Sequence, residues 1–235
     1  MNLASLRNRD VVLGSAATLA FTVPSLGGLL PFSTIEVAGF VTGGVCVWLL
    51  VRENVWNWPV GIANSGLYFV VFLQARLFAD SVLQLAFIAL GAGGWWYWLR
   101  GGSARGRRAI GRVAPGEALG VAAATALCTF VLAQYLQDVH DAAPMLDSLT
   151  TCLSLAATYL QARKFIENWP VWIAADLIYI PLYAWKRLPL TAGLYAVFLV
   201  MCIRGLAAWR NSMQQDGSRR STASLTPSLE GVTEP

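Results

Sequence analysis

Residues 167–172 read ENWPVW, and the letters NWPV occur once before, at residues 57–60. Asn57 and Asn168 are 111 positions apart (168 − 57), and this offset also pairs residues far beyond the motif without any gap. The further pairs include Tyr68 with Tyr179, Arg76 with Arg187, Phe87 with Phe198, Gly94 with Gly205 and Trp98 with Trp209. Shared hydrophobicity alone does not produce matches of Asn, Pro, Arg, Gly and Trp. The chain therefore contains an internal duplication.

The sequence around these repeats is strongly apolar. Of 235 residues, 56% are hydrophobic and 13% are charged, and the mean hydropathy is +0.54. Ordinary soluble domains carry about 25% charged residues. The apolar residues form long blocks, and about 20 helical residues, each rising about 1.5 Å, cross a hydrocarbon core of roughly 30 Å. We therefore predict an all-α polytopic membrane protein.

The apolar blocks predict seven core spans. Their approximate ranges are 34–51, 56–75, 78–99, 116–137, 145–163, 168–185 and 189–209. The uncharged segment 11–32 is broken by Pro24, Gly27 and Gly28, and it is either an eighth span or a helix in the membrane interface. After residue 210 the chain is polar and has too little apolar content to fold alone.

The repeats and spans divide the chain into five parts. These are an N-terminal hydrophobic or interfacial segment (1–33), a first three-helix repeat (34–100), a basic cytoplasmic loop with a linker helix (101–140), a second three-helix repeat (141–210) and a disordered cytoplasmic tail (211–235). A single linker span returns the chain to the side from which the first repeat began, so the two repeats are predicted to be parallel. Parallel repeats related by an axis along the membrane normal are typical of transporters that bind substrate near the midplane.

Charge predicts the orientation. The stretch 100–112 carries five Arg residues, whereas the loop 137–147 carries Asp138, Asp141 and Asp147. The positive-inside tendency places the first stretch in the cytoplasm and the second outside. Alternation of the spans then makes the C-terminus cytoplasmic.

Several motifs resemble those of the nicotinamide riboside transporters of the PnuC type. They are RENVWNWPVGIAN, LFADSVLQ, LTTCLSLAATYLQARKFIENWPVW and LTAGLYAVFLVMCIRGLAAWR, in this order between about residues 35 and 210. The resemblance implies a SWEET-like fold of three, one and three helices and a homotrimer in the bacterial cytoplasmic (inner) membrane. It also implies uptake of nicotinamide riboside for NAD synthesis by facilitated diffusion, made one-way by a cytoplasmic riboside kinase.

The resemblance also bears on substrate. In the nicotinamide riboside branch the NWxxW pattern of the sixth span belongs to the binding site, and it is intact here as Asn168, Trp169 and Trp172. This favours nicotinamide riboside. Relatives carry other vitamins, so a thiamine-type transporter is the alternative.

The residues themselves describe a compatible site. Trp169, Trp172, Asp176, Tyr179 and Tyr183 follow spacings of three and four, which place them on one helix face. Nicotinamide riboside is a planar cation joined to a polar ribose, and a cation–π contact with an aromatic face contributes about 0.5 to 2 kcal/mol. The Asp176 carboxylate balances the positive charge, because carboxylates inside membranes are costly and usually functional. Hydroxyl and carboxamide partners are expected from Asn57, Asn64, Tyr68, Gln84 and Thr150 or Thr151.

Structural roles compete with this interpretation. Asn57 and Asn168 precede a proline by two residues and also suit helix N-caps. Trp58 and Trp169 also suit anchors in the interfacial aromatic belt, as do the tryptophans of the stretch WWYWLR. Trp172 separates the interpretations, because its repeat partner is Gly61 and a duplicated anchor would not need to differ there.

Polar side chains within the spans have a second structural alternative. Gln84, the Thr pair and Asp176 also suit hydrogen bonds between helices. Asp176 also leaves proton coupling of transport open.

Other classes of function fit less well. The chain has one His, no clustered carboxylates and no GxxxxGK[ST] motif, so we predict no enzymatic activity, no cofactor and no metal. Basic residues lie in short stretches between spans, which argues against nucleic acid as a partner. A non-transporting membrane binding protein is the alternative class, which the duplicated three-span unit favours less.

Overall fold

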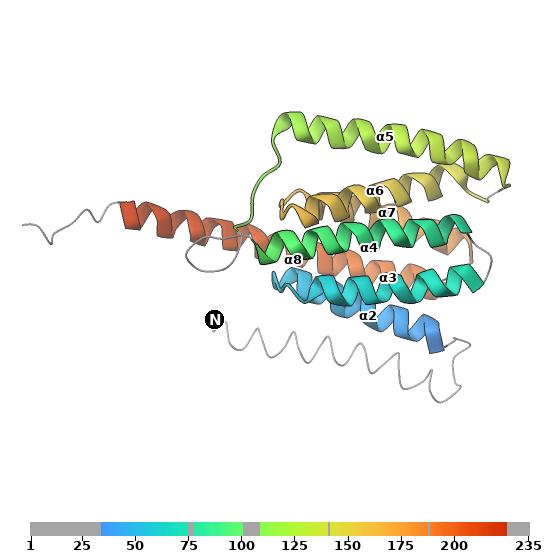
Figure 1. Cartoon of the computed structure of the whole chain (residues 1–235), viewed down its shortest axis with the longest axis horizontal. Coiled ribbons are helices and arrows are strands. Elements are labelled where there is room, and N and C mark those ends of the chain that lie inside the picture. The colour runs from blue at the N-terminus through green and yellow to red at the C-terminus, as the bar shows by residue number, and fades with distance from the viewer. Residues whose placement is uncertain (1–33, 75–77, 101–108, 141, 188, 225–235) are drawn as a thin grey trace, which may run out of the picture.

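Seven α-helices make up most of the described part of the chain (Figure 1). The structure, a computed structural model, describes residues 34–74, 78–100, 109–140, 142–187 and 189–224. The helices are α2 (Thr34–Val51), α3 (Asn57–Gln74), α4 (Phe78–Leu99), α5 (Pro115–Asp138), α6 (Pro144–Ala162), α7 (Asn168–Trp185) and α8 (Pro189–Ser224). The predicted all-α class is confirmed, and all these bounds except the end of α8 follow the predicted spans within a few residues.

Local sequence explains several helix boundaries. Pro115 and Pro144 begin α5 and α6, where a missing backbone N–H costs nothing and the fixed φ suits a first helical turn. The turns between α2 and α3 and between α6 and α7 are built alike, because Glu53 and Lys164 both adopt a left-handed conformation, with φ of 54° and 59°. These residues are also 111 positions apart (164 − 53), so the turn follows the repeat.

Six of the helices contact one another in a closed ring. We call α2, α3 and α4 the first triplet and α6, α7 and α8 the second triplet. Within each triplet the consecutive helices contact one another, and the triplets meet where α4 packs on α6 and α8 packs on α2. Each contact within one triplet therefore has a counterpart within the other, and the two contacts between the triplets correspond to each other.

Helix α5 lies outside the ring (Figure 1) and, in the described part of the chain, contacts only α6. Its N-terminal approach is tied to the turn between α6 and α7, since the Gly111 N–H donates to the Lys164 carbonyl at 3.1 Å and the Gly111 carbonyl accepts from Ile166 at 3.0 Å. The Tyr159 hydroxyl donates to Glu117 at 2.7 Å. The linker is thus fastened to the second triplet.

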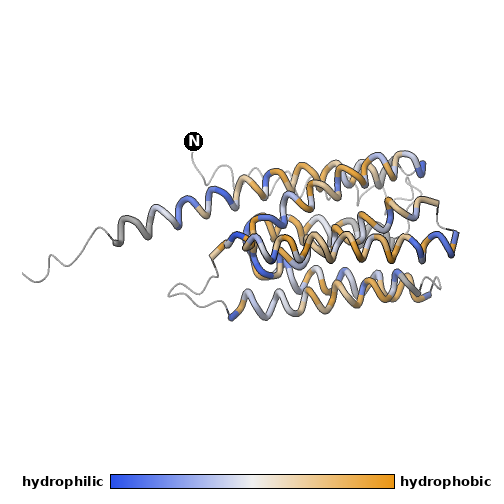
Figure 2. The backbone as a smooth tube through the Cα atoms, turned by 90° about the horizontal axis from the view of Figure 1, so that it is seen from above, coloured by the Kyte–Doolittle hydropathy of each residue, from blue (hydrophilic) through white to orange (hydrophobic). Residues whose placement is uncertain are grey.

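Apolar residues run along the helices, and hydrophilic residues gather near their ends and along the extension of α8 (Figure 2). Among the described residues, three stretches are long and apolar enough to cross a membrane by length and composition: Asp80–Leu99, Pro115–Asp138 and Ala192–Ser218. Helices α3, α6 and α7 carry Asn, Ser, Thr, Trp and Tyr residues, several of which are buried inside the bundle.

Two terminal predictions have different outcomes. The predicted disordered tail begins at residue 211, whereas α8 continues as a helix to Ser224 and extends well beyond the bundle (Figure 1). A helix already nucleated in the bundle adds one hydrogen bond for each further residue, so polar composition alone does not end it. The segment 11–32 and residues 225–235 lie outside the described residues.

Candidate functional site

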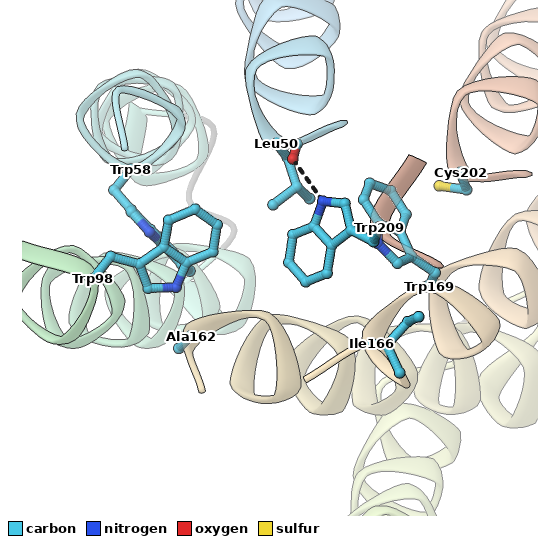
Figure 3. Close-up of a cluster of buried hydrophobic side chains, with 8 residues drawn as sticks. All are labelled: Leu50, Trp58, Trp98, Ala162, Ile166, Trp169, Cys202 and Trp209. Carbon is cyan, nitrogen blue, oxygen red and sulfur yellow. Dashed lines mark hydrogen bonds between the residues drawn. The ribbon is translucent and has the colours of Figure 1, made fainter. Parts of the chain in front are cut away.

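Four indole rings gather where α2, α4 and α6 end and α3 and α7 begin (Figure 3). We call this the basic end, because Arg52, Arg100 and Arg163 lie there. The tryptophan cluster consists of Leu50, Trp58, Trp98, Ala162, Ile166, Trp169, Cys202 and Trp209, all buried. It contains members from both triplets, so it joins them at this end.

Within each triplet, two indoles meet edge to face. The ring centroids of Trp58 and Trp98 are 5.6 Å apart at an interplanar angle of 86°. Those of Trp169 and Trp209 are 5.5 Å apart at 90°. Such pairs contribute about 0.5 to 1.5 kcal/mol beyond their burial. The geometry therefore repeats with the sequence offset.

Glycine makes both pairs possible. A Cβ added at Gly94 would overlap the ring of Trp58, and one added at Gly205 would overlap the ring of Trp169. These two glycines were matched by the sequence offset. Each indole therefore lies against the backbone of the neighbouring helix.

Two reciprocal hydrogen bonds cross between the triplets. Trp98 Nε1 donates to the carbonyl of Gln161 at 3.2 Å, and Trp209 Nε1 donates to the carbonyl of Leu50 at 3.2 Å. Both donors and both acceptors differ by 111 positions. The rings of Trp98 and Trp209 themselves lie 6.1 Å apart.

An ion pair joins equivalent positions of the two turns. Lys164 Nζ lies 2.9 Å from Glu53 Oε2, and the Lys164 side chain is 3% exposed. The ammonium also lies 4.9 Å from the centroid of the Trp98 ring. Glu53 and Lys164 are equivalent by the repeat. Because these equivalent positions contact each other, they lie next to the axis that relates the triplets.

These contacts decide between the structural roles considered for the motif. Trp58 and Trp169 are buried inside the bundle and not at its periphery, as a belt anchor would be. The side chains of Asn57 and Asn168 donate to the carbonyls of Asn54 and Phe165, at 2.7 and 2.6 Å. An N-cap side chain accepts a hydrogen bond from the helix backbone, so these asparagines stabilise the preceding turns instead.

The stretch WWYWLR divides between surface and core. Trp95 and Trp96 are exposed, as a membrane belt requires. Trp98 is buried and donates across the triplet boundary, so the belt interpretation does not apply to it.

The predicted stripe on α7 lies between α6 and α8. Trp172 is half-buried and its Nε1 donates to Gln161 Oε1 on α6 at 3.4 Å. Asp176 is buried, and its neighbour is the Cys202 thiol on α8. Tyr179 and Tyr183 stack on Tyr195 of α8 with centroid distances of 4.3 and 5.2 Å.

The candidate polar partners are only partly brought to this stripe. Thr150 is buried on α6, where its Oγ1 donates to the Leu146 carbonyl at 2.9 Å, and Thr151 beside it is half-buried. Gln84 is half-buried on α4, which does not contact α7 in the described part of the chain.

The partners on α3 lie toward α2. Asn64 Nδ2 lies 3.5 Å from the Gly39 carbonyl. Tyr68 packs against Gly39 and stacks on Phe72 with a centroid distance of 5.7 Å. Asn64 and Tyr68 therefore face α2 within the first triplet.

Several buried polar atoms on α3, α6 and α7 have no hydrogen-bond partner in the described part of the chain. They are the acceptors Asn64 Oδ1, Asn168 Oδ1 and Asp176 Oδ2, the Ser148 hydroxyl, and the indole N–H groups of Trp58 and Trp169. An unpartnered buried polar atom costs about 1 to 3 kcal/mol, so such atoms call for an explanation. Acceptors beside aromatic rings suit a ligand that carries donors and a positive ring.

Sequence reasoning missed two residues that contact the stripe. Tyr195 stacks on two members of the stripe, and Gln161 bonds to a third. The repeat offset could have indicated both residues. The equivalent of Tyr195 is Gln84 and the equivalent of Gln161 is Leu50, so both positions differ in chemistry between the repeats.

Comparison with known proteins assigns the family. The family model described as nicotinamide mononucleotide transporter matches residues 33–211. The PnuC nicotinamide riboside transporter of Escherichia coli (strain K12) is 26% identical over 231 residues, covering 87% of this chain and 97% of that protein. That of Neisseria mucosa is 27% identical over 198 residues, covering 76% of this chain and 73% of that protein.

Two further relatives extend the comparison. The riboflavin/roseoflavin transporter RibM of Streptomyces davaonensis is 25% identical over 201 residues, covering 84% of this chain and 90% of that protein. A crystal structure of the vitamin B3 transporter PnuC superposes with a TM-score of 0.66 at 23% identity, covering 86% of this chain and 92% of that one. This structural similarity supports the helical fold. With the family match over most of its length, the chain is an integral membrane protein that belongs to the nicotinamide mononucleotide transporter family.

Proposed function

We propose that this protein carries nicotinamide riboside across the membrane by facilitated diffusion, through a ring built as two parallel three-helix repeats. The pairwise match of contacts between the triplets supports this architecture, with α5 as the linker that keeps the repeats parallel. Transport then consists of movement of one triplet against the other around a central site. Family membership supports transport as the general function.

The observation that carries the substrate assignment is Trp172. It is half-buried, it lies one helical turn beyond the symmetric tryptophan cluster, and its repeat equivalent is Gly61. An aromatic ring on one side of the interior and its absence on the other give an asymmetric site. We infer that Trp172 stacks on the pyridinium ring of the riboside.

Asp176 supplies the matching charge. Asp176 is 3% exposed, and its Oδ2 has no hydrogen-bond partner in the described part of the chain. A carboxylate in this position is stabilised when a cationic ring approaches it, and a neutral ring gives no such gain. The polar groups that bind the ribose are Asn64, Tyr68, Gln84 and Thr151, together with Oδ1 of Asn168.

The orientation in this proposal follows from the charges and the alternating spans, whereas the assembly and the trapping of the product follow from the resemblance to PnuC-type transporters. The basic end is the cytoplasmic end, so the tryptophan cluster and the Glu53–Lys164 pair close the cytoplasmic side in this conformation. Substrate leaves when the triplets separate there. The protein acts as a homotrimer in the bacterial cytoplasmic membrane, and a cytoplasmic riboside kinase traps the product for NAD synthesis.

Calorimetric titration of the purified protein with nicotinamide riboside tests the assignment. We expect micromolar binding, and Trp172→Ala should weaken it by about tenfold or more, the loss of one desolvated cation–π contact with its burial. Trp185→Ala is the matched control, because this tryptophan lies at the other end of α7 and is 65% exposed. Unchanged affinity in Trp172→Ala would remove Trp172 from the site.

Riboflavin and thiamine serve as competing ligands in the same titration. Riboflavin is included because a relative of almost equal identity is a riboflavin/roseoflavin transporter. Its ring system is uncharged, so Asp176→Asn should weaken binding of the riboside and leave riboflavin binding unchanged. Preferential binding of riboflavin or thiamine would keep the fold and replace the substrate.

Flux of labelled riboside into liposomes separates transport from binding alone. Facilitated diffusion predicts equilibration of the riboside, unaffected by a proton or sodium gradient. Accumulation that requires a proton gradient would establish coupling, with Asp176 as the first candidate proton carrier. Binding without flux would identify a non-transporting binding protein.

A further inference from the structure

Gln161 joins four helices, and the repeat does not reproduce the contacts of its side chain. Its side chain on α6 is buried, and its Nε2 donates to Asn57 Oδ1 on α3 at 3.2 Å. Its Oε1 accepts from Trp172 Nε1 on α7 at 3.4 Å. Its backbone carbonyl accepts the indole N–H of Trp98 on α4.

Chemistry fixes the direction of both side-chain bonds. An indole N–H can only donate, so Oε1 of Gln161 must face Trp172 and its amide nitrogen must face Asn57. Asn57 uses its own Nδ2 to donate to the Asn54 carbonyl at 2.7 Å, which leaves its Oδ1 to accept. Rotation of the Gln161 amide by half a turn would break both bonds.

The two residues of this contact differ from the repeat together. The equivalent of Gln161 is Leu50 (161 − 111), which has no side-chain donor or acceptor, and the equivalent of Trp172 is Gly61. Asn168 Oδ1, equivalent to the oxygen that accepts from Gln161, is accordingly buried without a hydrogen-bond partner among the residues that the structure describes. Gln161 and Trp172, which both depart from the repeat, thus form a hydrogen bond with each other.

We propose that Gln161 is a positioning residue for substrate binding, which holds the Trp172 indole in the orientation that stacks on the substrate ring. The inference rests on the proposed function, because it requires Trp172 to contact the substrate. Gln161 acts through the indole N–H and ties the ring to the first triplet through Asn57. A ring held in advance loses less rotational freedom when the substrate binds.

A double-mutant cycle on the full-length protein tests this role, with the dissociation constant for nicotinamide riboside as the readout. Gln161→Met keeps the length of the side chain and removes both hydrogen bonds, and we expect it to weaken binding about fivefold or more. Trp172→Phe keeps an aromatic ring and removes the N–H. If Gln161 acts through Trp172, Gln161→Met should change affinity less than twofold in the Trp172→Phe background.

Two further variants strengthen the cycle. Thr125→Val is the matched control, because it removes a side-chain hydrogen bond to the Val121 carbonyl in α5, outside the ring, and should leave affinity unchanged. If Gln161→Met does not assemble, Gln161→Asn replaces it, being polar but too short to reach both partners.

Two outcomes would overturn the inference. They are unchanged affinity in Gln161→Met and an equal loss in the Trp172→Phe background. Failure of the proposed function is distinguished from these, because the unmodified protein would then not bind the riboside, or Trp172→Ala would bind it normally.

Discussion

The two triplets build the same anchor at the basic end and different surfaces beyond it. Trp58 and Trp98 pack in the first triplet as Trp169 and Trp209 pack in the second, each pair against a glycine. One turn further from this end, the first triplet has Gly61 where the second has Trp172. Duplication therefore maintains the packing of each triplet at the basic end, and divergence gives the interior two unlike sides.

The linker adds a second asymmetry. The segment before α5 bonds to the turn between α6 and α7, and Val113 N–H also donates to the Glu167 carboxylate at 3.1 Å. In the described part of the chain no such segment lies on the turn between α2 and α3. The second triplet therefore holds both the linker and the aromatic side of the proposed site.

The largest expected effect comes from reversing a charge next to the symmetry axis. Lys164→Glu places two carboxylates together at a nearly buried position and should lower stability by about 3 kcal/mol. Because Glu53 and Lys164 are equivalent, adding Glu53→Lys should restore most of the loss, with the new Lys beside Trp209. The midpoint of thermal unfolding in detergent measures both variants.

Lys186→Glu provides the comparison for this swap. Lys186 pairs with Asp147 at 2.7 Å near the other end of the bundle, and both side chains are more than a fifth exposed. The stability lost in Lys186→Glu should be smaller than that lost in Lys164→Glu, and adding Glu53→Lys should not restore it. A doubly exchanged variant no more stable than Lys164→Glu would contradict the equivalence of the two turns.

The second largest effect is expected at Gly94 and Gly205, the two glycines that pack against tryptophan rings. Gly94→Ala and Gly205→Ala each place a methyl group inside an indole ring of the cluster, and overpacking of this kind costs about 1 to 3 kcal/mol. The two losses should be similar, as the matched geometry requires. Thermal unfolding and size-exclusion chromatography would detect both.

Gly193→Ala is the control on α8, because an added Cβ there meets nothing within 4 Å. It should be neutral or slightly stabilising, since alanine favours a helix more than glycine does. Marked destabilisation by only one of the two cluster glycines would mean that the anchors are not equivalent.

The third largest effect is expected from removing the two reciprocal hydrogen bonds that Trp98 and Trp209 donate. Trp98→Phe and Trp209→Phe each remove a donor that crosses between triplets, with a cost of about 1 kcal/mol. The loss stays small because the carbonyls of Gln161 and Leu50 also accept from the backbone N–H of Lys164 and Glu53, at 2.9 Å each. Equal shifts in the unfolding midpoint are expected, with exposed Trp185→Phe unchanged.

The smallest effect concerns the linker. Glu117→Gln weakens the hydrogen bond from Tyr159 and removes a partly exposed ion pair with Arg163 at 3.9 Å, a loss of about 0.5 to 1 kcal/mol. Asp138→Asn, at the exposed far end of α5, is the control. A loss as large as that in Gly205→Ala would show that the linker, more than the ring, determines stability of the second triplet.

The sequence by itself determined the all-helical class, the seven helices, their approximate bounds and the duplication. It could do so because span length follows from membrane thickness and because the offset of 111 positions is visible without any structure. It also placed Trp169, Trp172, Asp176, Tyr179 and Tyr183 on one face, since that depends only on helical periodicity. It did not predict the helical continuation to Ser224, which depends on α8 being nucleated in the bundle.

Only the tertiary structure decided which residues meet across the boundary between the triplets. The sequence matched Trp98 with Trp209, and the same offset relates Glu53 to Lys164, but it gave no sign that the members of each pair would be in contact. It also gave no sign that Gln161 would reach Asn57 and Trp172. Helical periodicity fixes the face on which a side chain lies, whereas its partner on another helix depends on how the helices pack, because that contact joins residues far apart in the chain.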